Sequence, residues 1–209
     1  NCTFQLNEGD TGGGIYTSTA MTLTNCMFQT GMANHGGGIY IASASALVEL
    51  TDCSFNDNTS ERGGGMYIEN CNPILTDCHF KSNLAASGGG IWCNSGDPIL
   101  NTCHFTSNVA HLGSGGGMVC NNFSDAVLDS CIFISNEATF GGGFAGYAGS
   151  YLMLSNCEFH LNEAIHNEQG LGGGINFSGG NGGKNSTSLF LDNCLFESNF
   201  ADRPEAPLV

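Results

Sequence analysis

The fold is decided by a stretch that reads Cys78-His-Phe-Lys-Ser-Asn83-Leu-Ala-Ala-Ser-Gly88-Gly-Gly-Ile91-Trp-Cys93, after which the pattern begins again at Cys103-His-Phe105. Its Cys-x-Phe element recurs eight times along the chain, and one Gly-Gly-Gly lies between each pair of copies. The Cys-to-Cys steps are 24, 27, 25, 25, 28, 26 and 37 residues. A nearly fixed period indicates a repeat architecture in which each unit packs on its neighbours.

Within each repeat the pattern is that of short strands. Each repeat has three short segments in which apolar and polar residues alternate: an apolar run ending in Leu, the Cys-x-Phe element, and the segment that begins after the glycines. Asn, Asp and Gly residues separate these segments. No stretch has the ten or more residues of helical spacing that a helix needs. Three strands and three turns in about 25 residues form one coil of a parallel β-helix, whose coils stack about 4.8 Å apart. We therefore expect an all-β solenoid.

Stacking would place each repeated side chain above its counterpart, so we expect interior ladders. The cysteine ladder comprises Cys26, Cys53, Cys78, Cys103, Cys131, Cys157 and Cys194. In-register neighbours are poorly oriented for a relaxed disulfide, which favours buried reduced thiols over bridges between some pairs. The asparagine ladder comprises Asn58, Asn83, Asn108, Asn136 and Asn162. Asn tolerates the left-handed region, and its amide can bond to the next coil, so it suits a turn.

The glycine triplet fits a tight corner with a positive φ or a close approach of two backbones. The repeat contains Phe-x-x-Asn-x-Ala followed by Gly-Gly-x-Ile, and the first part is clearest at Phe80 to Ala85 and at Phe159 to Ala164. This pattern is similar to the repeats of polymorphic outer-membrane proteins and related right-handed β-helix proteins of bacterial surfaces. That family usually has Ala as the third residue of the motif, whereas all seven copies here have Gly. The resemblance implies a right-handed parallel β-helix of about seven to eight coils, with a pectin-lyase-like architecture, that is secreted or displayed on a surface.

Composition bounds the domains and the partners. We expect one β-helix domain over residues 1–201 and an extended tail over 202–209, where two prolines disfavour a helix. The chain has 4 Lys plus Arg against 19 Asp plus Glu, a formal net charge of -15. This charge argues against nucleic acid and anionic lipid as partners. The sequence has no apolar run long enough to span a membrane, so we expect no direct insertion of this segment.

One row of aromatic residues follows the glycines: Tyr16, Tyr40, Tyr67 and Trp92. By alternation these side chains face outward if Ile15, Ile39 and Ile91 face inward. An exposed aromatic row can stack on sugar rings or pack against another protein, which makes these residues the candidate contact surface. The alternative is that the row stabilises the sheet and is covered by the chain's own loops.

Sequons provide glycosylation candidates at Asn58, Asn122, Asn176 and Asn185. His79 and His104 share an outward position on consecutive coils, but the row offers no third ligand, so we expect a solvated pair and no metal site. Acidic residues are scattered rather than arranged as Asp-x-Asp-Gly, so we expect no cofactor, with Ca²⁺ at the turns as the alternative. Glu158, His160 and Glu197 converge near the last repeat, which we interpret as a chance cluster.

These patterns favour an extracellular or cell-surface rod with a structural or adhesive role, without catalytic activity. The expected partners are further copies of the chain, which would form filaments, or neighbouring surface proteins, with glycans as a further class. The alternative function is a polysaccharide-binding or polysaccharide-degrading module on the same fold. A hydrolase would require paired carboxylates on adjacent coils, and the outward positions beside Phe show no stacked acidic pair.

Overall fold

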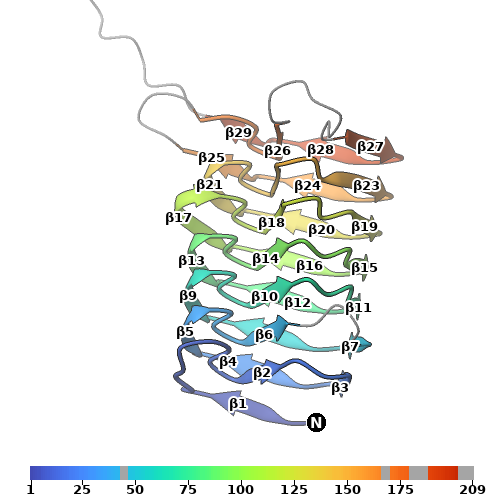
Figure 1. Ribbon diagram of the computed structural model, residues 1–209. Coiled ribbons are helices and arrows are strands. Elements are labelled where there is room, and N and C mark those ends of the chain that lie inside the picture. The colour runs from blue at the N-terminus through green and yellow to red at the C-terminus, as the bar shows by residue number, and fades with distance from the viewer. Residues whose placement is uncertain (43–46, 166–169, 179–187, 202–209) are drawn as a thin grey trace, which may run out of the picture.

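The computed structural model describes residues 1–42, 47–165, 170–178 and 188–201. The chain winds into a rod of stacked coils, with β1 at one end and β27 to β29 at the other (Figure 1). Every pairing between strands is parallel. The described residues contain no helix, so none is long and apolar enough to cross a membrane. The all-β parallel solenoid is therefore confirmed.

Four sheets run along the rod, one more per coil than the three strands expected from the sequence. The phenylalanine sheet contains β1 (Thr3–Gln5), β4 (Met27–Gln29), β8 (Ser54–Asn56), β12 (His79–Lys81), β16 (His104–Thr106), β20 (Ile132–Ile134), β24 (Glu158–His160) and β28 (Leu195–Glu197). The alanine sheet contains β5 (Met32–His35), β9 (Thr59–Arg62), β13 (Leu84–Ser87), β17 (Val109–Ser114), β21 (Glu137–Phe140), β25 (Glu163–Ala164) and β29 (Phe200–Ala201).

The other two sheets complete each coil. The aromatic sheet contains β2 (Ile15–Thr17), β6 (Ile39–Ala42), β10 (Met66–Glu69), β14 (Ile91–Asn94), β18 (Met118–Asn121), β22 (Phe144–Gly146) and β26 (Ile175–Phe177). The leucine sheet contains β3 (Met21–Thr24), β7 (Val48–Thr51), β11 (Ile74–Thr76), β15 (Ile99–Asn101), β19 (Ala126–Asp129), β23 (Tyr151–Ser155) and β27 (Ser188–Asp192). Apart from the end coils, each sheet thus receives one strand per coil, and it has seven or eight strands in all. The first described coil gives no strand to the alanine sheet, and the last gives none to the aromatic sheet.

The core is a set of side-chain ladders that follow from the register. Phe80 pairs with Phe55 on one side and Phe105 on the other. The phenylalanine rings form one stack from Phe4 to Phe196, with centroids 4.5–5.0 Å apart and planes within 8° of parallel. Burying each such ring contributes about 1.5–3 kcal/mol. The repeated sequence therefore produces a repeated core.

Two turns in each coil place a non-glycine residue in the left-handed region. One is the residue before the cysteine, as in Asp77 with a φ of 52°, and the other is the residue before the ladder asparagine, as in Ser82 with a φ of 54°. The expectation that the asparagine itself takes the left-handed conformation is therefore wrong. Because the preceding residue makes the turn, the asparagine side chain points into the core.

The asparagine ladder is fully buried and joins consecutive coils. Asn108 Nδ2 donates to the Phe80 carbonyl oxygen and to Asn136 Oδ1, each at 2.9 Å. Asn108 Oδ1 accepts from the backbone N–H of Asn83 at 3.1 Å and from Asn83 Nδ2 at 2.9 Å. Every polar atom of this buried amide therefore has a partner, as burial in an apolar core requires.

The cysteine ladder lies at the other turn, and all eleven cysteines are free thiols. Cys78 is fully buried, with Sγ 3.4 Å from the Thr76 carbonyl oxygen and 3.6 Å from that of Leu50. Contact with the Cys103 thiol, together with burial, raises the pKa of Cys78 to about 12. Contact with the Cys78 thiol and burial likewise raise the pKa of Cys53. These thiols are therefore protonated and unreactive in the folded chain.

Glycine is required at all three places of the triplet, for different reasons. The first glycine has a positive φ, as the sequence predicted, for example 65° at Gly63. A Cβ on the second would meet backbone of the next coil, since at Gly64 it would lie 2.4 Å from the Gly89 carbonyl oxygen. A Cβ on the third would meet the phenylalanine stack, since at Gly65 it would lie 2.8 Å from Phe80 Cδ1. Glycine at the third place therefore leaves room for the phenylalanine stack.

Candidate functional site

The aromatic row lies on the outer face of the aromatic sheet, as predicted, but most of it is not open to solvent. Tyr16 is 54% exposed, Tyr40 and Trp92 are half-buried, and Tyr67 is only 5% exposed. The Tyr40 and Tyr67 rings stack with centroids 4.9 Å apart. The sheet therefore brings the four side chains into one row, but the three that follow Tyr16 are much less exposed to solvent than Tyr16 is.

Side chains from the alanine sheet cover the row. The His35 ring of β5 packs edge-on against Tyr67, with centroids 5.0 Å apart. The Arg62 guanidinium of β9 lies 5.4 Å from the centroid of the Trp92 ring. Tyr40 donates to the Glu69 carboxylate, and burial followed by this hydrogen bond raises the pKa of Tyr40. The prediction that Tyr67 contacts a partner is wrong, because its ring is buried. The alternative, that other parts of the chain cover the row, fits Tyr40, Tyr67 and Trp92. Of the four aromatic residues, only Tyr16 is exposed.

A groove that was not predicted from the sequence crosses the outer face of the alanine sheet. It encloses about 1060 Å³ and runs from Glu8 and Asp10, past Thr59 and Glu61, to Leu112. The far end is a bulge in β17, where the register with β21 shifts between Ala110 and Ser114. The sequence signal was the 28-residue step from Cys103 to Cys131, which carries the extra residues of this bulge.

Three carboxylates and two potential cations line this groove. Glu8, Asp10 and Glu61 form no ion pair within the described ranges. Arg62 lies over Trp92 at one edge, and His111 Nδ1 lies 2.7 Å from the Ala85 carbonyl oxygen at another. The groove is therefore acidic and can receive an elongated neutral or basic ligand.

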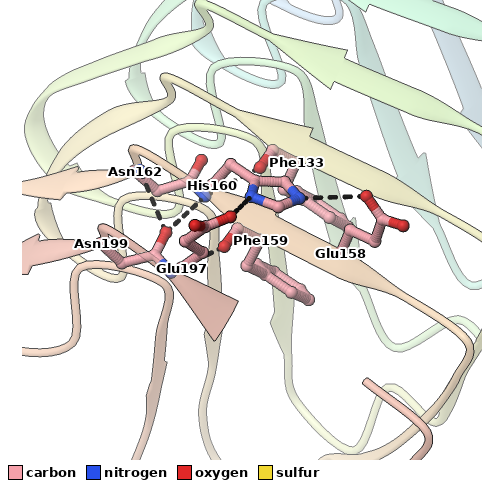
Figure 2. Close-up of polar contacts among 7 residues, drawn as sticks. All are labelled: Phe133, Glu158, Phe159, His160, Asn162, Glu197 and Asn199. Carbon is pink, nitrogen blue, oxygen red and sulfur yellow. Dashed lines mark hydrogen bonds and ion pairs between the residues drawn. The ribbon is translucent and has the colours of Figure 1, made fainter. Parts of the chain in front are cut away.

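Glu158, His160 and Glu197 meet on the outer face of the phenylalanine sheet (Figure 2). His160 and Glu158 come from β24, with Nε2 3.0 Å from Glu158 Oε2, and Glu197 of β28 has its Oε2 3.3 Å from His160 Nδ1. Both ring nitrogens thus face carboxylates, and the side chains of Glu158 and Glu197 are 48% and 66% exposed. This arrangement can tie the last two strands of the sheet together, and it lies outside the acidic groove.

His79 and His104 are in register on β12 and β16, with ring centroids 4.9 Å apart and an interplanar angle of 33°. Burial, with the neighbouring His79 as the next cause, lowers the pKa of His104. Across the described residues, no group of three or more His, Cys, Asp or Glu side chains is placed to hold a metal ion.

The sequons differ in exposure. Asn58 is a member of the buried ladder, with Nδ2 bonded to the Phe28 carbonyl oxygen and to Asn83 Oδ1, each at 3.0 Å. Glycosylation of Asn58 is therefore incompatible with the fold. Asn122 is exposed in a turn, and Asn176 is half-buried beside the Tyr147 hydroxyl at 3.3 Å. Asn185 and the tail 202–209 lie outside the described residues.

Comparison with known proteins identifies the class. A family model described as "Right handed beta helix region" matches residues 1–196, so the chain belongs to the right-handed β-helix family. Searches of curated proteins and of solved structures found no match. The family match agrees with the fold and gives its handedness, while the narrower similarity to polymorphic outer-membrane proteins is not confirmed.

Proposed function

We propose that this β-helix is an extracellular structural or adhesive rod that acts through its outer faces. The observation that carries the proposal is the unbroken phenylalanine stack from Phe4 to Phe196, because it makes the interior one continuous packed core. A rigid rod holds surface groups at fixed intervals, which suits binding to other repetitive surfaces. The buried, protonated thiols are compatible with an oxidising environment, since the thiolate is the reactive form.

The partners we propose are neighbouring surface proteins and further copies of the chain. The net charge of -15 favours partners with a basic surface and makes attraction depend on salt. Tyr16 and the acidic groove are the outer features best placed for such contacts, since both are open to solvent.

Protease treatment of intact producing cells tests the location. A surface rod should be removed by added protease while a cytoplasmic marker stays intact, and detection of the full-length chain only after lysis would contradict the proposal. Adhesion is tested with beads that carry residues 1–209 in place of a control protein of equal charge. Beads that bind neither one another nor isolated cell envelopes would argue against an adhesive role.

Polysaccharide binding in the acidic groove is the second candidate function. A groove of about 1060 Å³ that crosses several coils can take several sugar units, and its carboxylates favour neutral or amino sugars over uronates. A glycan panel assayed with the wild type and with Glu61→Gln tests this function. Binding that depends on Glu61 without turnover supports a binding module, turnover would show an enzyme, and no binding would remove this candidate.

A further inference from the structure

The histidine pair His79 and His104 has features that a solvated surface pair does not require. The two residues are directly paired on β12 and β16, and their rings are tilted by 33° with centroids 4.9 Å apart. Two nitrogens that bind one transition-metal ion lie at most about 4.2 Å apart, because each metal–nitrogen bond is about 2.0–2.1 Å. Because the ring nitrogens lie off the centroids, rings 4.9 Å apart can place one nitrogen of each within that distance, and rotation about the side-chain bonds of the exposed His79 can bring them there without moving the backbone.

The ring nitrogens of this pair are also uncommitted. Neither ring makes a hydrogen bond or an ion pair to any described residue, whereas His111 contacts the Ala85 carbonyl oxygen and His160 faces two carboxylates. The neighbours in the same row are Ser54 on β8 and Ile132 on β20, which compete weakly for these nitrogens. An imidazole with a free nitrogen is the ligand that Cu²⁺, Ni²⁺ and Zn²⁺ prefer among neutral side chains.

We propose that His79 and His104 together bind one divalent transition-metal ion on the outer face of the phenylalanine sheet. The chain supplies two imidazole ligands, and water fills the remaining positions, since the described residues offer no third ligand beside the pair. Such an ion keeps exchangeable positions and can accept a further ligand from outside the chain. The two-nitrogen set selects borderline transition metals over Ca²⁺ and Mg²⁺, which prefer oxygen ligands.

Titration of the untagged chain with Ni²⁺ and with Cu²⁺ tests the site. We expect one ion per chain, and we expect His79→Ala and His104→Ala each to weaken binding at least tenfold, because a single imidazole cannot chelate. The matched control is His111→Ala, which removes another surface histidine of the same rod and should leave affinity within twofold of the wild type. Equal affinity in the wild type and in either pair variant would overturn the proposal, as would equally tight binding of Ca²⁺.

Two further variants guard against loss of binding through misfolding. Ile132→His extends the row on β20 to three imidazoles and should tighten Zn²⁺ binding at least tenfold. Lys81→Ala removes a cation two residues from His79 on the same face and should tighten binding several-fold at low salt. Electron paramagnetic resonance of the Cu²⁺ complex should show two equivalent nitrogen ligands in the wild type. One nitrogen, or no gain with Ile132→His, would contradict a shared site.

Discussion

At the scale of single residues, the buried asparagine amide provides the sharpest test of the ladder. Changing Asn108 to Leu removes four hydrogen bonds and leaves the Phe80 carbonyl oxygen and the Asn83 N–H without this partner. Asn136 Oδ1 still accepts from the Asn108 backbone N–H, and Asn83 Nδ2 still donates to the Phe55 carbonyl oxygen. Each buried group left unpaired costs about 1–3 kcal/mol. For two such groups we expect the free energy of unfolding to fall by about 2–6 kcal/mol, measured by urea denaturation.

The control for this change is Asn94→Leu. Asn94 accepts a hydrogen bond from Asn122 Nδ2 at 2.7 Å, but the pair is exposed, so water replaces the lost partner. We expect a loss of less than about 1 kcal/mol. Equal losses in the two variants would mean that the ladder amides do not link the coils.

The cysteine ladder makes stability depend on pH in the alkaline range. The pKa of Cys78 is about 12 in the fold, whereas an unfolded thiol has a pKa of about 8.5. Above about pH 8.5 the unfolded chain therefore binds fewer protons than the native chain, so the free energy of unfolding falls as pH rises. Below that pH both states keep the proton and the effect is absent.

Urea unfolding of wild type and Cys78→Ala at pH 7.5, 9.0 and 10.0 measures this dependence. We expect a shallower decline with pH in Cys78→Ala, while Cys2→Ala, whose side chain is exposed, should keep the wild-type slope. Alkylation of the denatured, unreduced chain gives a second readout. If most cysteines are alkylated, the ladder thiols are reduced in the native chain. Finding four or five disulfides would contradict this prediction.

Residue-level prediction from the sequence succeeded where a residue type repeats with the period. The recurrence of Asn58 and its counterparts was enough to expect amide bonds between coils, but the sequon at Asn58 also suggested a glycan. A sequon is a local signal that carries no information on burial. Only the position of the preceding left-handed residue, Asp57 with a φ of 55°, turns the Asn58 amide inward.

At the scale of elements, the third glycine of each triplet limits how closely the corner approaches the phenylalanine stack. In Gly65→Ala the new Cβ would lie 2.8 Å from both Phe80 Cδ1 and the Gly90 carbonyl oxygen. Forcing this contact into a packed core costs about 1–3 kcal/mol. Gly9→Ala is the control, since its Cβ would lie no closer than 3.5 Å to any atom and should change stability by less than about 0.5 kcal/mol.

Thermal unfolding of both glycine variants tests this account, and adding Phe80→Leu to Gly65→Ala should recover part of the loss. If Gly65→Ala is as stable as the wild type, the corner adapts and the preference for Gly has another origin.

Elements were predictable where a strand carries a large repeated side chain. The strands around Phe, Leu and the residue after the glycines were found, whereas the alanine strand was missed because its inward residue is small, as at Ala85 in β13. The packing of His35 and Arg62 over the aromatic row could not be predicted either, because both residues belong to the alanine sheet that was missed. His35 and Arg62 precede the glycines of their own coils, so only the turn of the alanine sheet toward the aromatic sheet brings them onto Tyr67 and Trp92.

At the scale of the whole molecule, the last described coil exposes an apolar cross-section. Leu189 is 38% exposed, Leu191 45% and Phe196 41%, and their partners Leu152, Leu154 and Phe159 in the coil below are buried. Unpaired strand edges beside apolar side chains favour addition of another coil, so we expect association that increases with concentration. Sedimentation velocity from low to high micromolar concentration measures it.

Leu189→Lys combined with Leu191→Lys should suppress this association, because both residues lie in the exposed cross-section and charged side chains there oppose an incoming apolar surface. Leu112→Lys is the control, since Leu112 is 74% exposed on the β17 bulge, away from the cross-section. A monomer at every concentration would show that the end is covered in solution.

In the second coil, Gly31 stands three residues after Phe28, at the position that the ladder asparagine takes in other coils, and this affects local opening. The Gly31 N–H still donates to Asn58 Oδ1 at 2.9 Å, but Gly31 has no amide to accept from the coil before it. That first coil meets the alanine sheet only through isolated bridges at Glu8 and Thr11. Native-state hydrogen exchange should therefore release the amides of β1 and β2 through a low-energy opening, while those of β12 to β20 exchange only on global unfolding.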